Sequence, residues 1–113
     1  MNTATWKCSR EYLGLTHAWI ADQLGKNEKY VSSWDEPRRK SVPDYAAAFM
    51  REQLDVAAQL VGAMTVKWHE QKGDSPIAVP AGAGMAGGMP ASYHRRIASR
   101  VAERINVDID YII

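Results

Sequence analysis

The sequence predicts a mainly α-helical (α+β) protein of 113 residues. Three observations predict this class. Glycine-containing breaks at 14–16 and 25–27 separate short segments with helical spacing, and one longer segment over 43–71 has apolar residues at steps of three and four. The end of the chain, 107–113, alternates between apolar and polar residues, which is the period of a strand. We therefore expect a bundle of short helices, a long connecting helix and a small strand–helix–strand element.

Two short helices between residues 16 and 36 carry their own start and stop signals. Thr16 and Asn27 can each cap a helix by accepting a hydrogen bond from an early backbone N–H. Gly25, between them, can take the positive φ that reverses the chain sharply. The side chains expected to face the core are Ile20, Ala21, Leu24, Val31 and Trp34.

The spacing of Ala21, Gly25, Val31 and Trp34 indicates a helix-turn-helix unit. In such a unit the second helix, 27–34, would enter the major groove of DNA and read base edges with its outward polar residues. The start of the first helix, at Thr16, can hold a phosphate. The alternative is a helical hairpin in some other α-rich protein. The candidate DNA-binding residues are Thr16, His17, Asn27, Glu28, Lys29, Ser32, Ser33, Arg38, Arg39 and Lys40.

The distribution of charge supports part of this set. The net charge is only +1, but residues 1–41 carry seven Lys and Arg against five Asp and Glu, whereas residues 42–113 carry seven against eight. Three of the positive residues are consecutive at 38–40, and charges act locally because salt screens them over about 8–10 Å. The cluster therefore predicts a phosphate contact, or else a solvated basic loop.

The segment 43–71 reads as one long helix. Pro43 suits its first turn, Asp44 favours the positive end of its dipole, and Lys72-Gly73 would end it. Its apolar stripe comprises Phe49, Met50, Leu54, Ala57, Leu60, Val61, Met64 and Trp68. We place residues 1–71 in a DNA-binding domain and residues 72–113 in a dimerisation element.

The dimerisation element begins with an extended run at 76–80 and a Gly-rich stretch at 81–89, whose composition is that of a flexible linker. A helix over 90–105 follows, and then the strand 107–113. The apolar faces of this helix and strand need a cover, for which the long helix and a second subunit are the best candidates. The strand face expected to be half-buried consists of Val107, Ile109, Tyr111 and Ile113.

The helix over 90–105 also carries a series of basic residues. A solvated outer face is the simplest interpretation. A second nucleic-acid contact, or partners for acidic residues across a dimer, are the alternatives. The series is His94, Arg95, Arg96, Arg100 and Arg104.

Several other classes of function are not expected. Gly82, Gly84 and Gly87 fit a dinucleotide-binding glycine pattern, but Pro90 delays the helix beyond the third glycine and no further sheet follows. We see no catalytic set, no metal-ligand spacing and no implied cofactor, and we expect Cys8 to be a small buried residue. No apolar run is long enough to span a membrane, so we expect a cytoplasmic protein. Because no catalytic set is visible, we do not expect an enzyme.

Residues 5–44 resemble the Cro/C1-type (XRE-like) helix-turn-helix domains of phage and bacterial regulators. These domains often run Trp-Glu-x-Gly-Arg-x-x-Val-Pro-Asp after the recognition helix, and the stretch here runs from Trp34 to Val42-Pro43-Asp44 with one extra residue. The glycine is replaced in Pro37-Arg38-Arg39, and Lys26 stands where an apolar residue usually packs. The layout of the whole chain is similar to the phage anti-CRISPR-associated (Aca) regulators.

The resemblance implies a homodimer that binds an inverted repeat in double-stranded DNA near its own promoter and represses transcription. The size of one recognition helix also favours a dimer, because two half-sites about 34–36 Å apart supply enough contacts for specificity. The near-neutral charge leaves one alternative: a non-enzymatic protein–protein adaptor of phage type that binds a host factor.

Overall fold

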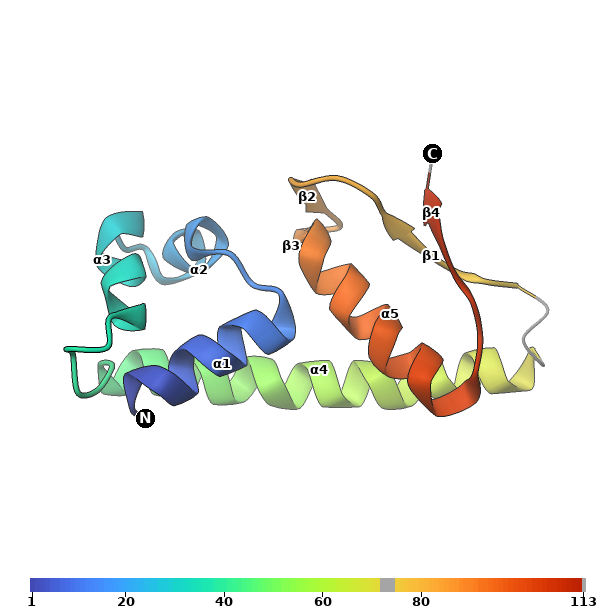
Figure 1. Ribbon diagram of the computed structural model, residues 1–113, viewed down its shortest axis with the longest axis horizontal. Coiled ribbons are helices and arrows are strands. Elements are labelled where there is room, and N and C mark those ends of the chain that lie inside the picture. The colour runs from blue at the N-terminus through green and yellow to red at the C-terminus, as the bar shows by residue number, and fades with distance from the viewer. Residues whose placement is uncertain (72–74, 113) are drawn as a thin grey trace.

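The computed structural model describes residues 1–71 and 75–112. The protein is mainly α-helical with a small β part. The long helix α4 runs along one side of the molecule, and the other elements pack against the face of α4 that is turned toward the interior (Figure 1). The helices are α1 (Thr3–Leu13), α2 (His17–Leu24), α3 (Glu28–Ser32), the 3-10 helix η1 (Ser33–Asp35), α4 (Asp44–Glu70) and α5 (Ala91–Ile105). The strands are β1 (Ile77–Pro80), β2 (Met85–Ala86), β3 (Met89–Pro90) and β4 (Ile109–Ile112).

The predicted caps of α2 and α3 are confirmed. The N–H of Trp19 donates to the Thr16 hydroxyl at 3.1 Å, and the N–H of Lys29 donates to the Asn27 side chain at 2.8 Å. Gly25 ends α2 with a φ of +63°, in the left-handed region that favours glycine. These local signals set where each short helix begins and where the chain turns.

Helix α3 is shorter than the predicted 27–34. It ends at Ser32, and Ser33–Asp35 continue as the tighter η1 turn. The turn packs the Trp34 ring, which is 0% exposed, edge-on against Trp6 of α1 at a centroid distance of 5.1 Å. The reason for the difference is therefore tertiary, since the buried ring constrains the last turn more than helix propensity does.

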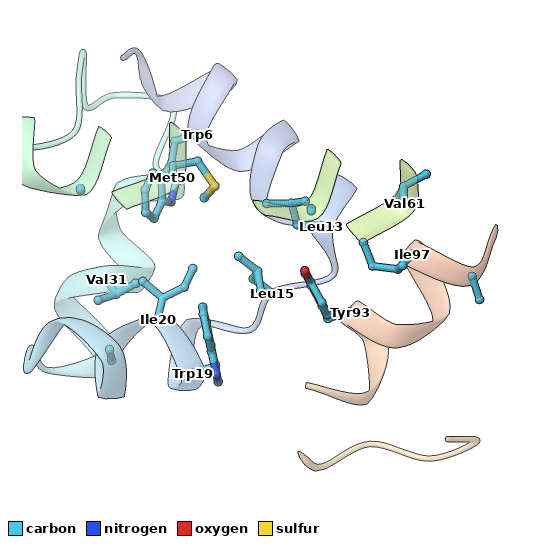
Figure 2. Packing of buried hydrophobic residues seen from close by; sticks show 14 of the residues in the cluster. Trp6, Leu13, Leu15, Trp19, Ile20, Val31, Met50, Val61, Tyr93 and Ile97 are labelled. Atoms are coloured by element: carbon cyan, nitrogen blue, oxygen red, sulfur yellow. The ribbon is translucent and has the colours of Figure 1, made fainter. Parts of the chain in front are cut away.

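The buried apolar side chains form one cluster along the inner side of α4 (Figure 2). Most of the predicted stripe of α4 is buried or half-buried, but Leu60 at its edge is 38% exposed. Leu24 is half-buried at the margin of the cluster. Members of the cluster that come from α1 to α4 include Trp6, Leu13, Leu15, Trp19, Ile20, Ala21, Val31, Trp34, Met50, Ala57 and Val61, and those from β1 onward include Ile77, Val79, Tyr93, Ile97, Ala98, Val101 and Val107.

The C-terminal elements contain two separate two-stranded sheets. β1 pairs in parallel with β4, and β2 pairs antiparallel with β3. The expectation of a flexible linker at 81–89 is wrong, because β2, β3 and the turn between them form an ordered hairpin. Its carbonyls find donors: the Trp19 indole N–H donates to Gly88 O at 2.9 Å, and the N–H of Ala91 donates to Gly84 O at 2.8 Å.

The strand at 107–113 differs from the expected half-buried face. Val107 is buried, but every residue of β4 is exposed, including Ile109 at 39% and Tyr111 at 60%. Along 109–112 the strand pairs only with β1, and no other described element covers these side chains as α5 covers those of β1. Ile113 and the predicted helix end at Lys72-Gly73 lie outside the described residues.

Two smaller features complete the fold. Cys8 is exposed on α1, so the prediction of a buried thiol is wrong. It follows Trp6 by two residues, which places it away from the buried side of the helix. Across residues 1–71 and 75–112, every helix is too short or too polar to pass through a membrane.

Candidate nucleic-acid interface

The solvent side of α3 presents the polar residues that the sequence singled out. Asn27, Glu28 and Lys29 are exposed, and Ser32 is half-buried. Val31, on the opposite side of the helix, is 0% exposed and fixes that side in the core. The outward side chains at the start of α3 are therefore open to a partner, while the helix itself is held from beneath.

Aromatic side chains hold α3 against the start of α4. The Trp34 ring lies 5.3 Å from the ring of Tyr30 and 5.9 Å from that of Tyr45, both in edge-to-face geometry. Aromatic pairs of this kind add about 0.5–1.5 kcal/mol beyond the area they bury. Together with the Trp6–Trp34 contact, they make the position of α3 relative to α1 and α4 well determined.

A polar network ties the end of α3 to α1 and α2. The Arg10 guanidinium donates to Asp35, with Nη2 2.7 Å from Oδ2, and also to the carbonyl of Leu15 at 3.1 Å. The Nε2 atom of His17 lies 3.1 Å from the same Asp35 Oδ2. The Arg10 and Asp35 side chains are each only 15% exposed, so this pair is screened less than a surface salt bridge. The His17 ring is thus engaged inside the protein, and its backbone N–H remains at the start of α2.

Thr16 and Ser33 differ in what their hydroxyls already do. The Thr16 oxygen accepts the capping bond from the N–H of Trp19. Its own O–H is therefore free to rotate and donate to an acceptor outside the helix. The Ser33 hydroxyl donates to the carbonyl of Tyr30. Ser33 therefore has its one donor occupied within η1, whereas exposed Thr16 can donate to a phosphate oxygen.

The basic loop that follows η1 is anchored through Arg39. The Arg39 Nε donates to Ser41 O at 2.9 Å, its guanidinium carbon lies 5.8 Å from the centroid of the Tyr30 ring, and its carbonyl accepts from Thr3 at 2.9 Å. Arg38 and Lys40 are exposed and make no side-chain hydrogen bond or ion pair with any described residue. The loop thus presents two unpaired charges on a backbone that is fixed from behind.

An aromatic and cationic patch lies beside this loop. Tyr30 and Tyr45 are 41% and 42% exposed, and the Lys26 ammonium sits 5.0 Å from the centroid of the Tyr45 ring. The neighbouring Tyr45 hydroxyl holds the pKa of the Tyr30 hydroxyl below its ordinary value, and Arg39 lowers this pKa to a smaller extent. Lys26 therefore extends along an aromatic face and keeps its charge at the surface.

The structure brings the candidate residues into two neighbouring groups and adds others that the sequence did not single out. One group is at the starts of α2 and α3, and the other is on the loop at 38–40. The additional residues are Arg10, Asp35, Tyr30 and Tyr45. Arg10 and Asp35 are 25 positions apart, so no local spacing could have indicated their pairing. Tyr30 could have been found as the aromatic residue beside the polar, outward positions of α3.

Within residues 1–71 and 75–112, no three His, Cys, Asp or Glu side chains gather in a way that could hold a metal ion. Neither a protein-family model, nor a curated protein, nor a solved structure matches this chain.

Proposed function

We propose that the protein is a sequence-specific regulator that binds double-stranded DNA through α2 and α3, used as a helix-turn-helix unit. The single observation that carries this proposal is the placement of α3. Its start is exposed and polar, its back is fixed by Val31 and Trp34, and the unpaired charges of Arg38 and Lys40 lie on the next loop. A short helix of this kind can enter the major groove while the loop holds the phosphate backbone.

The roles within the interface follow from which hydrogen-bond donors and acceptors of each residue are still free. Asn27, Glu28, Lys29 and Ser32 would face base edges. Arg38, Lys40, Thr16 and the backbone N–H of His17 would contact phosphates, because they are the donors left available at the rim. Arg39, His17 and Ser33 would act mainly by holding the loop, the start of α2 and η1 in place.

The same proposal includes a homodimer formed through the C-terminal part. The support is β4, which pairs on one side only among the described residues. Its side chains Ile109, Tyr111 and Ile112 are 39%, 60% and 61% exposed. Two-stranded sheets are marginal in water, and an open edge with apolar side chains favours pairing with a second copy. A twofold dimer would then present two α3 helices to an inverted repeat.

The decisive experiment selects bound sequences from random duplex DNA with the full chain. A palindromic consensus with half-sites about one helical turn apart is the expected result. Lys29→Ala should then relax specificity at particular bases. Lys67→Ala, in the last turn of α4 and away from α3, should leave the consensus unchanged. A library in which no sequence is enriched at low salt would overturn DNA binding.

The dimer is tested separately in the full chain. Tyr111→Lys places a charge on the exposed strand and should convert a dimer to a monomer in sedimentation velocity, with loss of tight binding to the full palindrome. A wild-type chain that sediments as a monomer at micromolar concentration would contradict the dimer while leaving single half-site binding in place.

A protein–protein adaptor is the second candidate, and one observation favours it. Glu28 and Glu36 are exposed around α3 and oppose a phosphate backbone. An adaptor would bind a host protein in equal stoichiometry and retain no DNA at low salt. The selection experiment separates the two candidates, because only the DNA-binding protein enriches a sequence.

A further inference from the structure

Helix α5 carries five basic side chains, and the structure shows that three of them are used inside the protein. The His94 Nε2 lies 2.6 Å from Ala86 O, and the Arg95 guanidinium donates to Pro80 O at 2.7 Å and to Gly82 O at 2.8 Å. The Arg100 guanidinium is half-buried, with its carbon 4.6 Å from the centroid of the Tyr12 ring. A wholly solvated basic face is therefore wrong for these three residues.

Arg96 and Arg104 are the two that remain exposed. Neither makes a side-chain hydrogen bond or an ion pair with the residues the structure describes. They lie two turns apart on α5, with Arg96 in its second turn and Arg104 in its last. The two arginines are thus chemically matched and differ in what they lie beside.

The first turn of α5 is docked closely on the turn between α1 and α2. The Ser92 hydroxyl donates to the carbonyl of Gly14, and a Cβ added at Gly14 would lie 2.5 Å from Ser92 O. Tyr93 belongs to the same buried cluster as Leu13 and Leu15 (Figure 2). Arg96 is one helical turn after Ser92, so this docking fixes its backbone beside the start of α2.

A hollow of about 420 Å³ lies at this junction. Arg96 lines it together with Thr16, His17 and Glu28, which are residues at the starts of α2 and α3. The hollow therefore joins α5 to the same edge of the molecule as the interface proposed above. Arg104, in the last turn of α5, does not line it.

The charges around the hollow leave one positive side chain for a partner. Arg10 also lines it but is paired with Asp35, while Glu11 and Glu28 contribute negative charge. Arg96 is exposed, and its guanidinium makes no hydrogen bond or ion pair with the described residues. A guanidinium in this position can hold a phosphate group in bidentate geometry.

We propose that Arg96 is a DNA-backbone contact contributed by the C-terminal helix, which binds a phosphate beside the start of α2. This inference rests on the proposed DNA-binding function and deepens it. Arg96 would then belong to the nucleic-acid interface as well as to the C-terminal element. DNA would contact both parts of the chain at once.

The test uses the full chain and a duplex that carries the sequence selected by the wild-type protein. Fluorescence anisotropy at several salt concentrations gives the affinity and its salt dependence. Arg96→Ala should weaken binding by about five- to tenfold and reduce the slope of log affinity against log salt by about one, uniformly across sequences. Arg96→Lys should keep the slope, because it keeps the charge.

Arg104→Ala is the matched control and should change the affinity less than about twofold, with the slope unchanged. Thermal unfolding of each variant verifies the fold, and Arg96→Gln serves as a second variant that keeps the aliphatic stem. If the wild type binds DNA while Arg96→Ala and Arg96→Gln match its affinity and slope, this inference alone is overturned. Equal losses in Arg96→Ala and Arg104→Ala overturn it as well. A wild type that binds no DNA overturns the proposed function and the inference together.

Discussion

The basic loop at 38–40 and the basic face of α5 carry similar charge in the sequence, yet their side chains have different surroundings. In the loop, Arg38 and Lys40 are exposed and unpaired among the described residues. On α5, Arg95 and His94 bind backbone carbonyls, and Arg100 lies against an aromatic ring. Similar positive charge in a sequence can therefore be left available to a partner in one segment and be used within the fold in another.

The backbone around each segment explains the difference. The chain from β1 into the hairpin presents the carbonyls of Pro80, Gly82 and Ala86 to α5, whose Arg95 and His94 side chains bind them. The loop at 38–40 has its own carbonyl at Arg39 satisfied by Thr3. Buried or half-buried acceptors take up donors wherever they are within reach, because an unmade hydrogen bond costs about 1–3 kcal/mol.

The largest effect is expected where α5 docks on the N-terminal helices. Gly14→Ala should lower the free energy of unfolding by about 3 kcal/mol, since Gly14 has a φ of +66° and its new Cβ would meet the backbone of Ser92. Gly25 has nearly the same φ, but a Cβ added there would meet no other atom within 4 Å. Gly25→Ala should therefore lower the free energy of unfolding by only about 1 kcal/mol. Urea denaturation measures both. Equal losses would mean that the close docking of α5 is not a constraint.

The next effect separates the loop from α5 in DNA binding. Replacing Arg38 and Lys40 together by alanine should weaken DNA binding by about a hundredfold and reduce the salt slope by about two. Stability should change by less than about 0.5 kcal/mol, because neither side chain has a partner in the described structure. Anisotropy titrations at two salt concentrations measure the binding. An unchanged affinity would remove the loop from the interface.

Arg95→Ala should show the opposite pattern. Loss of its bonds to Pro80 O and Gly82 O should lower the free energy of unfolding by about 1 kcal/mol, while the folded variant keeps the DNA affinity of the wild type. Chemical denaturation and anisotropy on the same preparation separate the two quantities. A loss of affinity and salt slope without a loss of stability would mean that Arg95 is a DNA contact after all.

The smallest effect concerns Tyr30, whose ring contacts Arg39 of the loop at 38–40. The pKa of Tyr30 is lowered in the folded protein by Tyr45 and then by Arg39, so its ionisation stabilises the fold as pH rises through that lowered pKa toward the unfolded value of about 10. Below this range the contribution is absent. Absorbance at 295 nm should show one tyrosine ionising early, and Tyr30→Phe should remove that step. An unchanged titration curve in the variant would contradict the assignment.

Much of the helical part could be predicted because its signals are local. Thr16, Asn27 and Gly25 act on backbone groups only two or three residues away, and the stripe on α4 follows from helical periodicity alone. The short end of α3 could not be predicted in this way. It depends on the contact of Trp34 with Trp6, which is 28 positions earlier in the chain.

The candidate site divides along the same line. The sequence indicated which residues on α3 and the loop are polar and outward, and the structure agrees for Asn27, Glu28 and Lys29. It could not indicate that His17 faces Asp35 or that Arg96 shares a hollow with Thr16. These pairs meet only after α2, η1 and α5 have packed, so their distances are set by the core.

The sequence by itself determined the helices, their caps and turns, the apolar stripe of α4 and the basic character of residues 38–40 and of α5. Those properties arise from propensity, periodicity and short-range hydrogen bonds, which the order of residues specifies directly. Only the tertiary structure decided which of the basic residues are available, because the carbonyls that bind His94 and Arg95 lie 8 and 15 positions earlier and reach them only once this preceding segment has packed on α5. A charge is fixed by the sequence, but its partner is fixed by the fold.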